Sequence, residues 1–227
     1  MMDPRAIFVR SHTTLATAPL VPEVPLHLAS DSQRIFQRAA EAQGATGSPF
    51  QPYWAFAWPG GQAIARYLID NPSLVAGKRV IDIGSGSGIG AIAAVEAGAR
   101  SVLAVDIDPL AETAIRLNGI LNDCSAVLST STKDVLGDEP DADVVLISDL
   151  VYEPELATRV GRFLDGLVAT GHVVLLGDRA TARQPASGLE EIARYHAPLA
   201  PALIDDSLEE GRVWRFRARA RGQGTAP

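Results

Sequence analysis

The pattern of apolar positions changes near residue 78. From Lys78 onward, apolar strands and helices alternate at roughly 25 to 30 residues, the spacing of βαβ units in a parallel sheet. Several of the strand candidates are apolar on both faces, as expected where helices cover both sides of a sheet. Five strands are predicted over 79–83, 101–107, 125–130, 143–150 and 172–178, with helices over 89–97, 109–122 and 154–169.

Both ends of the chain depart from this alternation. Residues 11–29 hold three prolines and predict an extended arm, followed by helices over 31–42 and 62–69. After the fifth strand we expect a helix near 187–196. Two apolar runs around an acidic turn within 201–220 then predict an antiparallel hairpin at the sheet edge.

These segments fit a chain of 227 residues with enough length for one large domain. Hydrophobic residues make up 47% and charged residues 21%, which is typical of globular proteins and not of disordered ones. We predict an N-terminal arm and helix over 1–60 that contributes to substrate recognition, an α/β domain over 61–218 and a flexible tail over 219–227.

Charge and cysteine content exclude several protein classes. The net charge of -7 argues against nucleic acid as a partner. The single cysteine cannot form an internal disulfide, and the four histidines lack metal-ligand spacing, so no metal site is expected. No uncharged run of membrane-spanning length is continuously apolar, and the N-terminus lacks the apolar core of a signal peptide. We expect a cytoplasmic protein, and a monomer.

A glycine loop, Asp82-Ile-Gly-Ser-Gly-Ser-Gly88, directly follows the first predicted strand and opens a helix. Backbone amides in such a loop can approach a ligand without obstruction by side chains. The nicotinamide-binding motif G-x-G-x-x-G is not matched when counted from Gly84, but its looser form G-x-G-x-x-A is matched from Gly86. A nicotinamide-dependent dehydrogenase is therefore an alternative function. Asp82 at the loop entrance would repel a pyrophosphate and favour a cation.

Asp106 ends the next strand, 24 positions after Asp82. An acidic residue at about this distance reaches the hydroxyls of a ribose. The two carboxylates and the loop together indicate an adenosine ligand without phosphates. The alternative is that both acids only cap helices, and capping is the preferred role for Asp108, which precedes Pro109.

The loop and the V-D-I-D sequence at the next strand end resemble the seven-β-strand S-adenosylmethionine methyltransferases. This resemblance implies a Rossmann-like α/β fold: a mostly parallel sheet with a C-terminal antiparallel hairpin, helices on both faces and an N-terminal extension. It also implies S-adenosylmethionine as cofactor and S-adenosylhomocysteine as product. Asp134, after the third strand, lies where this family meets the adenine, although its surroundings match no strict motif. The implied cofactor-binding residues are Trp58, Asp82, Gly84, Ser85, Gly86, Gly88, Asp106, Ile107 and Asp134.

Asp149-Leu-Val-Tyr152 follows the fourth strand. This D-x-x-Y sequence resembles the family-16 protein methyltransferases, many of which modify lysine, and differs from the N-P-P-Y of amide and nucleobase methyltransferases. The resemblance implies that Asp149 and Tyr152 are catalytic and orient a lysine amine. Spacing alone leaves a second interpretation equally open, in which Asp149 caps the helix that begins near Pro154.

The aromatic stretch 53–62 closely resembles the lysine methyltransferases of the electron-transfer flavoprotein β subunit. Most of residues 20–217 share the resemblance; the matching segments are 20–29, 70–88, 105–118 and 211–216. The chain departs at Ser87, where the vertebrate form carries cysteine, and at 177–184, where a GDPGR-type segment is replaced. The second departure leaves open whether the choice of target is unchanged.

This resemblance implies that lysines of the flavoprotein β subunit are the substrate and that Tyr53, Trp54 and Trp214 bind it. A different interpretation of the aromatic residues is that they cover a core. Alternative activities are methylation of a ribosomal-protein lysine or of a small amine such as nicotinamide. A non-catalytic module that binds the cofactor is the alternative outside enzymes.

Overall fold

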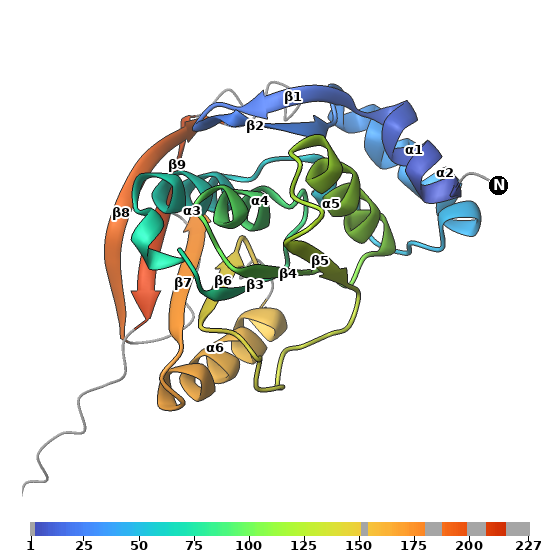
Figure 1. Ribbon diagram of the computed structural model, residues 1–227. Coiled ribbons are helices and arrows are strands. Elements are labelled where there is room, and N and C mark those ends of the chain that lie inside the picture. Colours follow the sequence, from blue (N-terminus) through green and yellow to red (C-terminus); the bar gives the residue numbers. More distant parts are fainter. Residues whose placement is uncertain (1–2, 151–153, 180–187, 199–207, 217–227) are drawn as a thin grey trace, which may run out of the picture.

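A single seven-stranded sheet forms the centre of the computed structural model, which describes residues 3–150, 154–179, 188–198 and 208–216 (Figure 1). The strand order is β5-β4-β3-β6-β7-β9-β8. The strands are β3 (Arg79–Ile83), β4 (Ser101–Val105), β5 (Leu128–Ser131), β6 (Val144–Ser148), β7 (Val173–Arg179), β8 (Leu189–Pro198) and β9 (Leu208–Phe216). The five from β3 to β7 pair in parallel, and β9 pairs antiparallel with both β7 and β8. The predicted fold class, a mostly parallel sheet with a C-terminal antiparallel hairpin, is confirmed.

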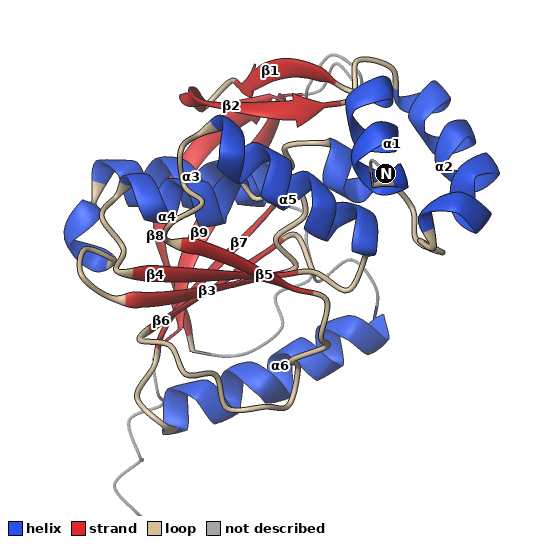
Figure 2. Cartoon of the chain, turned by 45° about the vertical axis from the view of Figure 1, so that its right-hand side comes forward, coloured by secondary structure: helices blue, strands red, loops and turns tan. Residues whose placement is uncertain are grey.

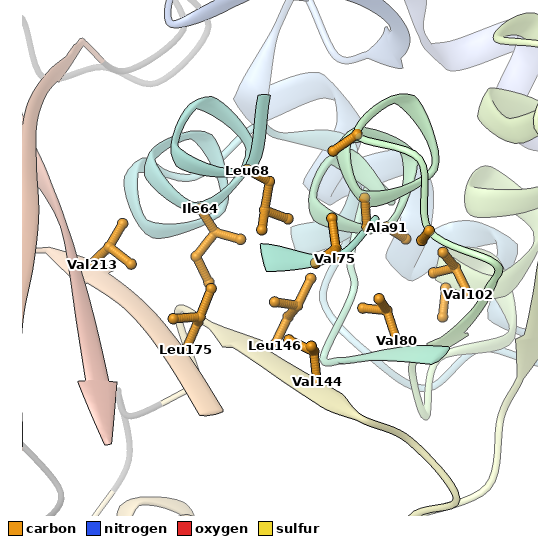
Figure 3. Close-up of a cluster of buried hydrophobic side chains, with 14 of the residues drawn as sticks. Ile64, Leu68, Val75, Val80, Ala91, Val102, Val144, Leu146, Leu175 and Val213 are labelled. Carbon is orange, nitrogen blue, oxygen red and sulfur yellow. The ribbon is translucent and has the colours of Figure 1, made fainter. Parts of the chain in front are cut away.

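Helices cover both faces of this sheet (Figure 2). On one face lie α3 (Pro59–Asp70), α4 (Ile89–Glu96) and α5 (Pro109–Leu121), and on the other lies α6 (Pro154–Ala169). Because both sheet faces are apolar, two core clusters form. Ile64, Leu68 and Ala91 pack from the helices on Val80, Val102, Leu146 and Leu175 of the strands in the first cluster (Figure 3). In the second, Val160 and Leu164 of α6 pack on Val145 of β6.

The N-terminal residues form a compact layer over α4 and α5. This layer consists of α1 (Pro4–His12), β1 (Thr14–Ala18), β2 (Val21–Leu28) and α2 (Ser32–Thr46), with short 3-10 turns at Tyr53–Ala55 and Pro72–Leu74 further along the chain. The predicted extended arm is an antiparallel hairpin in which β2 buries Val24 and Leu26 against Ile92 and Ala93 of α4. Prolines are tolerated in β2 because a two-stranded sheet leaves one side of each strand without a neighbour.

The prediction of a helix near 187–196 is wrong. Leu189–Pro198 is strand β8, which pairs along β9 with a register shift between Glu191 and Ala193. The hairpin at the sheet edge therefore begins before the first apolar run that the sequence indicated, and residues 199–207 lie outside the described ranges.

Within the described ranges, no helix has both the length and the apolar character needed to cross a membrane.

Candidate functional site

The carboxyl ends of the parallel strands carry most of the predicted site residues. The glycine loop runs from the end of β3 to the start of α4, and three of its glycines have left-handed backbone angles: φ is 69° at Gly84, 55° at Gly86 and 83° at Gly88. The N–H groups of Gly84 and Ser85 donate to the carbonyl of Val105 over 2.8 and 3.1 Å. The loop is therefore folded over the end of β4, in a conformation that favours glycine.

Asp82 lies beneath this loop and is 2% exposed. Its carboxylate accepts a hydrogen bond from Ser85 Oγ over 2.7 Å. Burial raises its pKa to about 6, while the Ser85 hydrogen bond acts in the opposite direction. A cation bound nearby would favour the ionised form of this carboxylate.

Asp106 connects the end of β4 to the same loop. One carboxylate oxygen accepts from the N–H of Gly86 over 2.9 Å and the other from the N–H of Asp108 over 3.0 Å. Burial raises the pKa of Asp106 to about 6, and the Asp108 charge adds to this effect. Ile107 beside it is 50% exposed, so this strand end presents both a carboxylate and an apolar surface.

Asp108 itself caps α5. Its side chain accepts a hydrogen bond from the N–H of Leu110 over 2.8 Å, as the sequence predicted.

Asp149 caps the N-terminus of α3, which the sequence did not indicate; the residues just before α6, the helix that the sequence offered instead, lie outside the described ranges. Its φ of 53° turns the carboxylate toward α3, where it accepts hydrogen bonds from the N–H groups of Gly60 (3.2 Å) and Gly61 (2.9 Å). Burial raises the pKa of Asp149 to about 7. Tyr152, its predicted catalytic partner, lies outside the described residues.

Close packing of α3 on the sheet places those two amides at Asp149. A Cβ atom on Gly60 would lie 2.5 Å from the carbonyl carbon and oxygen of Gly177 in β7. Glycine also stands at position 211 of β9, where a side chain would collide with the carbonyl of Pro59. The missing side chains allow the N-terminus of α3 to rest directly on β7 and β9.

Leu150 joins the two halves of the site. A Cβ on Gly84 would lie 2.5 to 2.7 Å from three side-chain carbons of Leu150, so this leucine packs directly on the glycine loop. The segment after β6 that carries Asp149 therefore touches the loop after β3.

The aromatic stretch is divided between the surface and the core. Trp58 immediately precedes α3; its Nε1 donates to the carbonyl of Tyr53 over 2.9 Å, and the two rings lie 6.0 Å apart. Tyr53 is 43% exposed, whereas Trp54 is 1% exposed and belongs to a core cluster with Phe8 of α1 and Ile35 of α2. Trp214 is 3% exposed and packs in the cluster beneath α6.

These positions separate the three predicted substrate-binding residues. Tyr53 lies where a substrate can reach it, but Trp54 and Trp214 are enclosed by protein in this structure. For Trp54 the alternative interpretation, that the aromatic residues cover a core, describes the observed position.

Asp134 pairs with a side chain of α6. Its carboxylate forms an ion pair with Arg159 of α6 at 2.7 Å, and the pKa of Asp134 is lowered mainly by that guanidinium. A contact between Asp134 and the cofactor stays a prediction.

Two polar residues at the site were missed by the sequence analysis. Asp178, 5% exposed near the end of β7, adjoins Asp149 across the sheet. Asn118 is fully buried on α5, where it accepts from the N–H of His27 and donates to the carbonyl of Ser87, both over 2.8 Å. The sequence signals that could have identified them are the carboxylate of Asp178 at a strand end and the amide of Asn118 on the apolar face of a helix.

Comparison with known proteins adds to this geometry. The family model for ribosomal protein L11 methyltransferase (PrmA) matches residues 67–154. The electron transfer flavoprotein beta subunit lysine methyltransferase of Xenopus laevis is 36% identical over 219 residues, which cover 92% of this chain and 85% of that protein. The protein of the same name from Homo sapiens is 34% identical over 226 residues, covering 95% and 84%.

A solved structure, ribosomal protein L11 methylase from Lactobacillus delbrueckii subsp. bulgaricus, superposes with a TM-score of 0.52 at 24% identity. The match covers 70% of this chain and 79% of that chain, and at this identity it supports the fold alone.

Proposed function

We propose, because the chain belongs to the family of electron transfer flavoprotein beta subunit lysine methyltransferases, that it transfers methyl groups from S-adenosylmethionine to lysine side chains of that flavoprotein subunit. The observation that carries the proposal is the extent of the similarity, which covers 92% of the chain and so extends into the N-terminal layer as well as across the glycine loop.

The residues around the glycine loop fit the proposed cofactor. S-adenosylmethionine, when bound, supplies a methyl group on a positively charged sulfonium. Asp106 is suited to its ribose hydroxyls, and the left-handed glycines leave the backbone free to approach it. The desolvated carboxylate of Asp82 suits a ligand that carries positive charge near the loop and no phosphate. Trp58 and Ile107 would add apolar surface.

The chemistry requires a neutral amine. With a reference pKa of ~10.4, removing the proton from a lysine ammonium costs roughly 4 to 5 kcal/mol at neutral pH. Asp149 is fixed by two amides of α3, and its oxygens retain lone pairs that can accept hydrogen bonds from an amine. Holding the nitrogen in line with the methyl group is then the main contribution of the protein. Tyr152 is proposed as the second group that orients the amine.

Recognition of a protein substrate is assigned to residues 1–60. Phe50 and Tyr53 are 39% and 43% exposed, and Trp58, which follows Tyr53 closely, stands at the end of α3 that Asp149 caps. An exposed apolar surface beside the amine site suits a macromolecule better than a small molecule. The cytoplasmic location and monomeric state stay predictions.

A ribosomal-protein lysine is the second candidate substrate, favoured by the family match over residues 67–154. That segment contains the glycine loop and Asp149 but neither the hairpin nor the aromatic stretch. The match therefore supports a cofactor-binding segment in common with the ribosomal protein L11 methyltransferases, and it is weaker support for a ribosomal protein as the substrate.

The test is mass spectrometry of purified electron-transfer flavoprotein after incubation with the enzyme and S-adenosylmethionine. We expect stepwise mass gains of one methyl group on lysines of the β subunit. The matched variant is Asp149→Asn, because asparagine keeps the shape, tolerates a left-handed backbone and still accepts one amide hydrogen bond. It should bind the cofactor and lose most turnover.

Absence of any mass gain with an enzyme that binds the cofactor would contradict the flavoprotein assignment. The same assay would then be run on ribosomal proteins and small amines.

A further inference from the structure

Asp178 stands beside Asp149 at the carboxyl edge of the sheet. β6 and β7 are parallel neighbours in the sheet (Figure 1). Ser148 of β6 pairs with Gly177 of β7, and the two aspartates are the next residues after this pair. The N–H of Asp149 donates to the carbonyl of Gly177 over 2.9 Å, which holds the segments together. Asp149 and Asp178 are called the carboxylate pair below.

One of the two carboxylate oxygens of Asp178 accepts no hydrogen bond from the described residues. Oδ1 accepts from the N–H of Arg179 over 2.7 Å, while Oδ2 is buried without a partner among the residues that the structure describes. A buried oxygen of this kind is unfavourable until a donor reaches it, and more so when it is charged. A donor that arrives with the substrate would satisfy it.

The carboxylate pair is also electrostatically unfavourable when both members are ionised. Burial raises the pKa of Asp178 to about 6. Burial and, next, the charge of Asp178 raise the pKa of Asp149 to about 7. An ammonium group placed against both carboxylates would relieve their repulsion and favour their ionised forms.

The surrounding charges offset this cost only in part, since the pKa of each member stays raised. Arg179 lowers the pKa of both members of the pair. Arg212, in register with Asp178 on β9, donates from its two terminal nitrogens to Glu191 and Glu210, while its Nε is buried without a partner among the described residues. The N-terminus of α3 contributes neutral amides, and α6, which packs on β7, carries the exposed Glu155 in its first turn.

We propose that Asp178 is a second binding group for the substrate's lysine amine, which with Asp149 holds the incoming ammonium and takes up its proton; this role rests on the proposed methylation of lysine. The step conserves atoms and charge, since an ammonium and a carboxylate become a neutral amine and a carboxylic acid. The amine then carries the lone pair that methyl transfer requires. The same two charges discriminate against neutral amides, which bring no positive charge to the site.

The first test compares wild type with Asp178→Asn on the flavoprotein substrate. Asparagine preserves the acceptor for the Arg179 N–H and removes the charge. We expect kcat/KM to fall at least about tenfold while the cofactor Kd stays unchanged. The acidic limb of the pH profile of kcat/KM should move to lower pH, because Asp149 loses a negatively charged neighbour. The control is Asp165→Asn on α6, an exposed carboxylate whose replacement changes the net charge equally.

The second test needs no substrate. The side-chain carboxyl carbon of Asp149 is titrated by carbon-13 NMR in wild type and in Asp178→Asn, and the midpoint should be lower in the variant. If Asp178→Asn does not fold, Asp178→Glu retains the charge at a shifted position and should keep the midpoint raised while weakening turnover.

An unchanged kcat/KM profile in Asp178→Asn, or an unchanged Asp149 midpoint, would overturn this inference. Loss of cofactor binding in parallel with activity would also overturn it, since that would indicate a structural role. If wild type itself transfers no methyl group to the flavoprotein, the proposed function fails, and the NMR midpoint alone then decides whether the two carboxylates act as a pair.

Discussion

Asn118 donates a hydrogen bond from Nδ2 to the backbone carbonyl of Ser87 in the glycine loop over 2.8 Å. The side-chain oxygen of the same residue accepts the N–H of His27 in β2, also over 2.8 Å. A single buried amide on α5 therefore ties the N-terminal hairpin to the loop proposed to hold the cofactor.

Replacing Asn118 by leucine should weaken both connections. The buried N–H of His27 and carbonyl of Ser87 would lose their partners, at about 1–3 kcal/mol each. We expect a lower free energy of unfolding in urea and a weaker affinity for S-adenosylmethionine by calorimetry. Asn122→Leu is the matched control, because the side-chain amide of Asn122 donates to the carbonyls of Pro25 in the hairpin and Asn118 in α5, and not to the glycine loop. It should lose stability and retain cofactor affinity; equal losses of affinity in both variants would contradict the special role of Asn118.

The close packing of α3 on β7 predicts that Gly60→Ala is destabilising. Its Cβ would lie 2.5 Å from backbone atoms of Gly177, which cannot move aside as a flexible side chain can. We expect a loss of about 1–3 kcal/mol from overpacking, measured by urea unfolding, together with reduced methyl transfer as the amides shift from Asp149.

Gly44→Ala provides the control for that variant. Gly44 lies inside the regular helix α2, and a Cβ atom added to it would meet no other atom within 4 Å. Alanine there should raise stability by about 0.5–1 kcal/mol. Equal stability of Gly60→Ala and wild type would show that the helix end is not confined by the strand.

The sequence predicted the parallel strands well because helices cover the sheet on both sides and most residues of β3, β4, β6 and β7 are apolar. It placed two of the five strand ends too late: the predicted segments 101–107 and 143–150 end at Val105 and Ser148 in the structure. The carboxylates that follow belong to turns, and the φ of 53° at Asp149 cannot continue a strand.

The wrong helix near 187–196 has a physical cause. Leu189, Ile192 and Ala193 follow helical spacing, and the two glutamates between Leu189 and Ile192 favour a helix. In the structure, pairing with β9 outweighs that preference, and the register shift after Glu191 breaks the alternation that would have indicated a strand. Local propensity is a weak guide when a long-range partner is available.

The candidate site shows the same limit. The glycine loop and its acids lie within 25 positions and could be identified together, whereas the partners of Asp149 are Gly60 and Gly61, 89 and 88 positions away. No local pattern shows which helix a strand-end carboxylate caps. The burial of Trp54 likewise depends on α1 and α2 packing beside it.

At high pH and in the absence of cofactor, the Asp82→Asn variant should be more stable than wild type. Because folding raises the Asp82 pKa from 3.8 to about 6, the folded state holds a proton that the unfolded chain has lost, and stability falls as pH rises through that window. The ionised carboxylate then costs about 3 kcal/mol above pH 6. Urea unfolding should show a gain for the variant at pH 8 that largely disappears at pH 4, with weaker cofactor binding.

Asp143→Asn is the control of opposite sign. The hydrogen bonds from Arg79 hold the pKa of Asp143 well below its usual value, so its charge contributes stability at neutral pH that is lost as the pH falls. The asparagine variant should therefore be less stable than wild type at pH 8. A gain in both variants would point to relief of overall negative charge and not to the buried position of Asp82.

Tyr53→Ala should weaken the binding of the protein substrate and leave the cofactor site intact. The ring is 43% exposed and packs edge-on against Trp58 at 6.0 Å, so its removal takes away contact surface and about 0.5–1.5 kcal/mol of aromatic pairing. We expect KM for the flavoprotein to rise several-fold, with kcat and the cofactor Kd near wild type, and Tyr53→Phe to retain most of the affinity. Ile120→Ala, which removes a 55% exposed side chain from the second half of α5, should not change KM. If Tyr53→Ala and Ile120→Ala give the same KM, the aromatic surface does not contact the substrate and the recognition assigned to residues 1–60 must come from elsewhere in that layer.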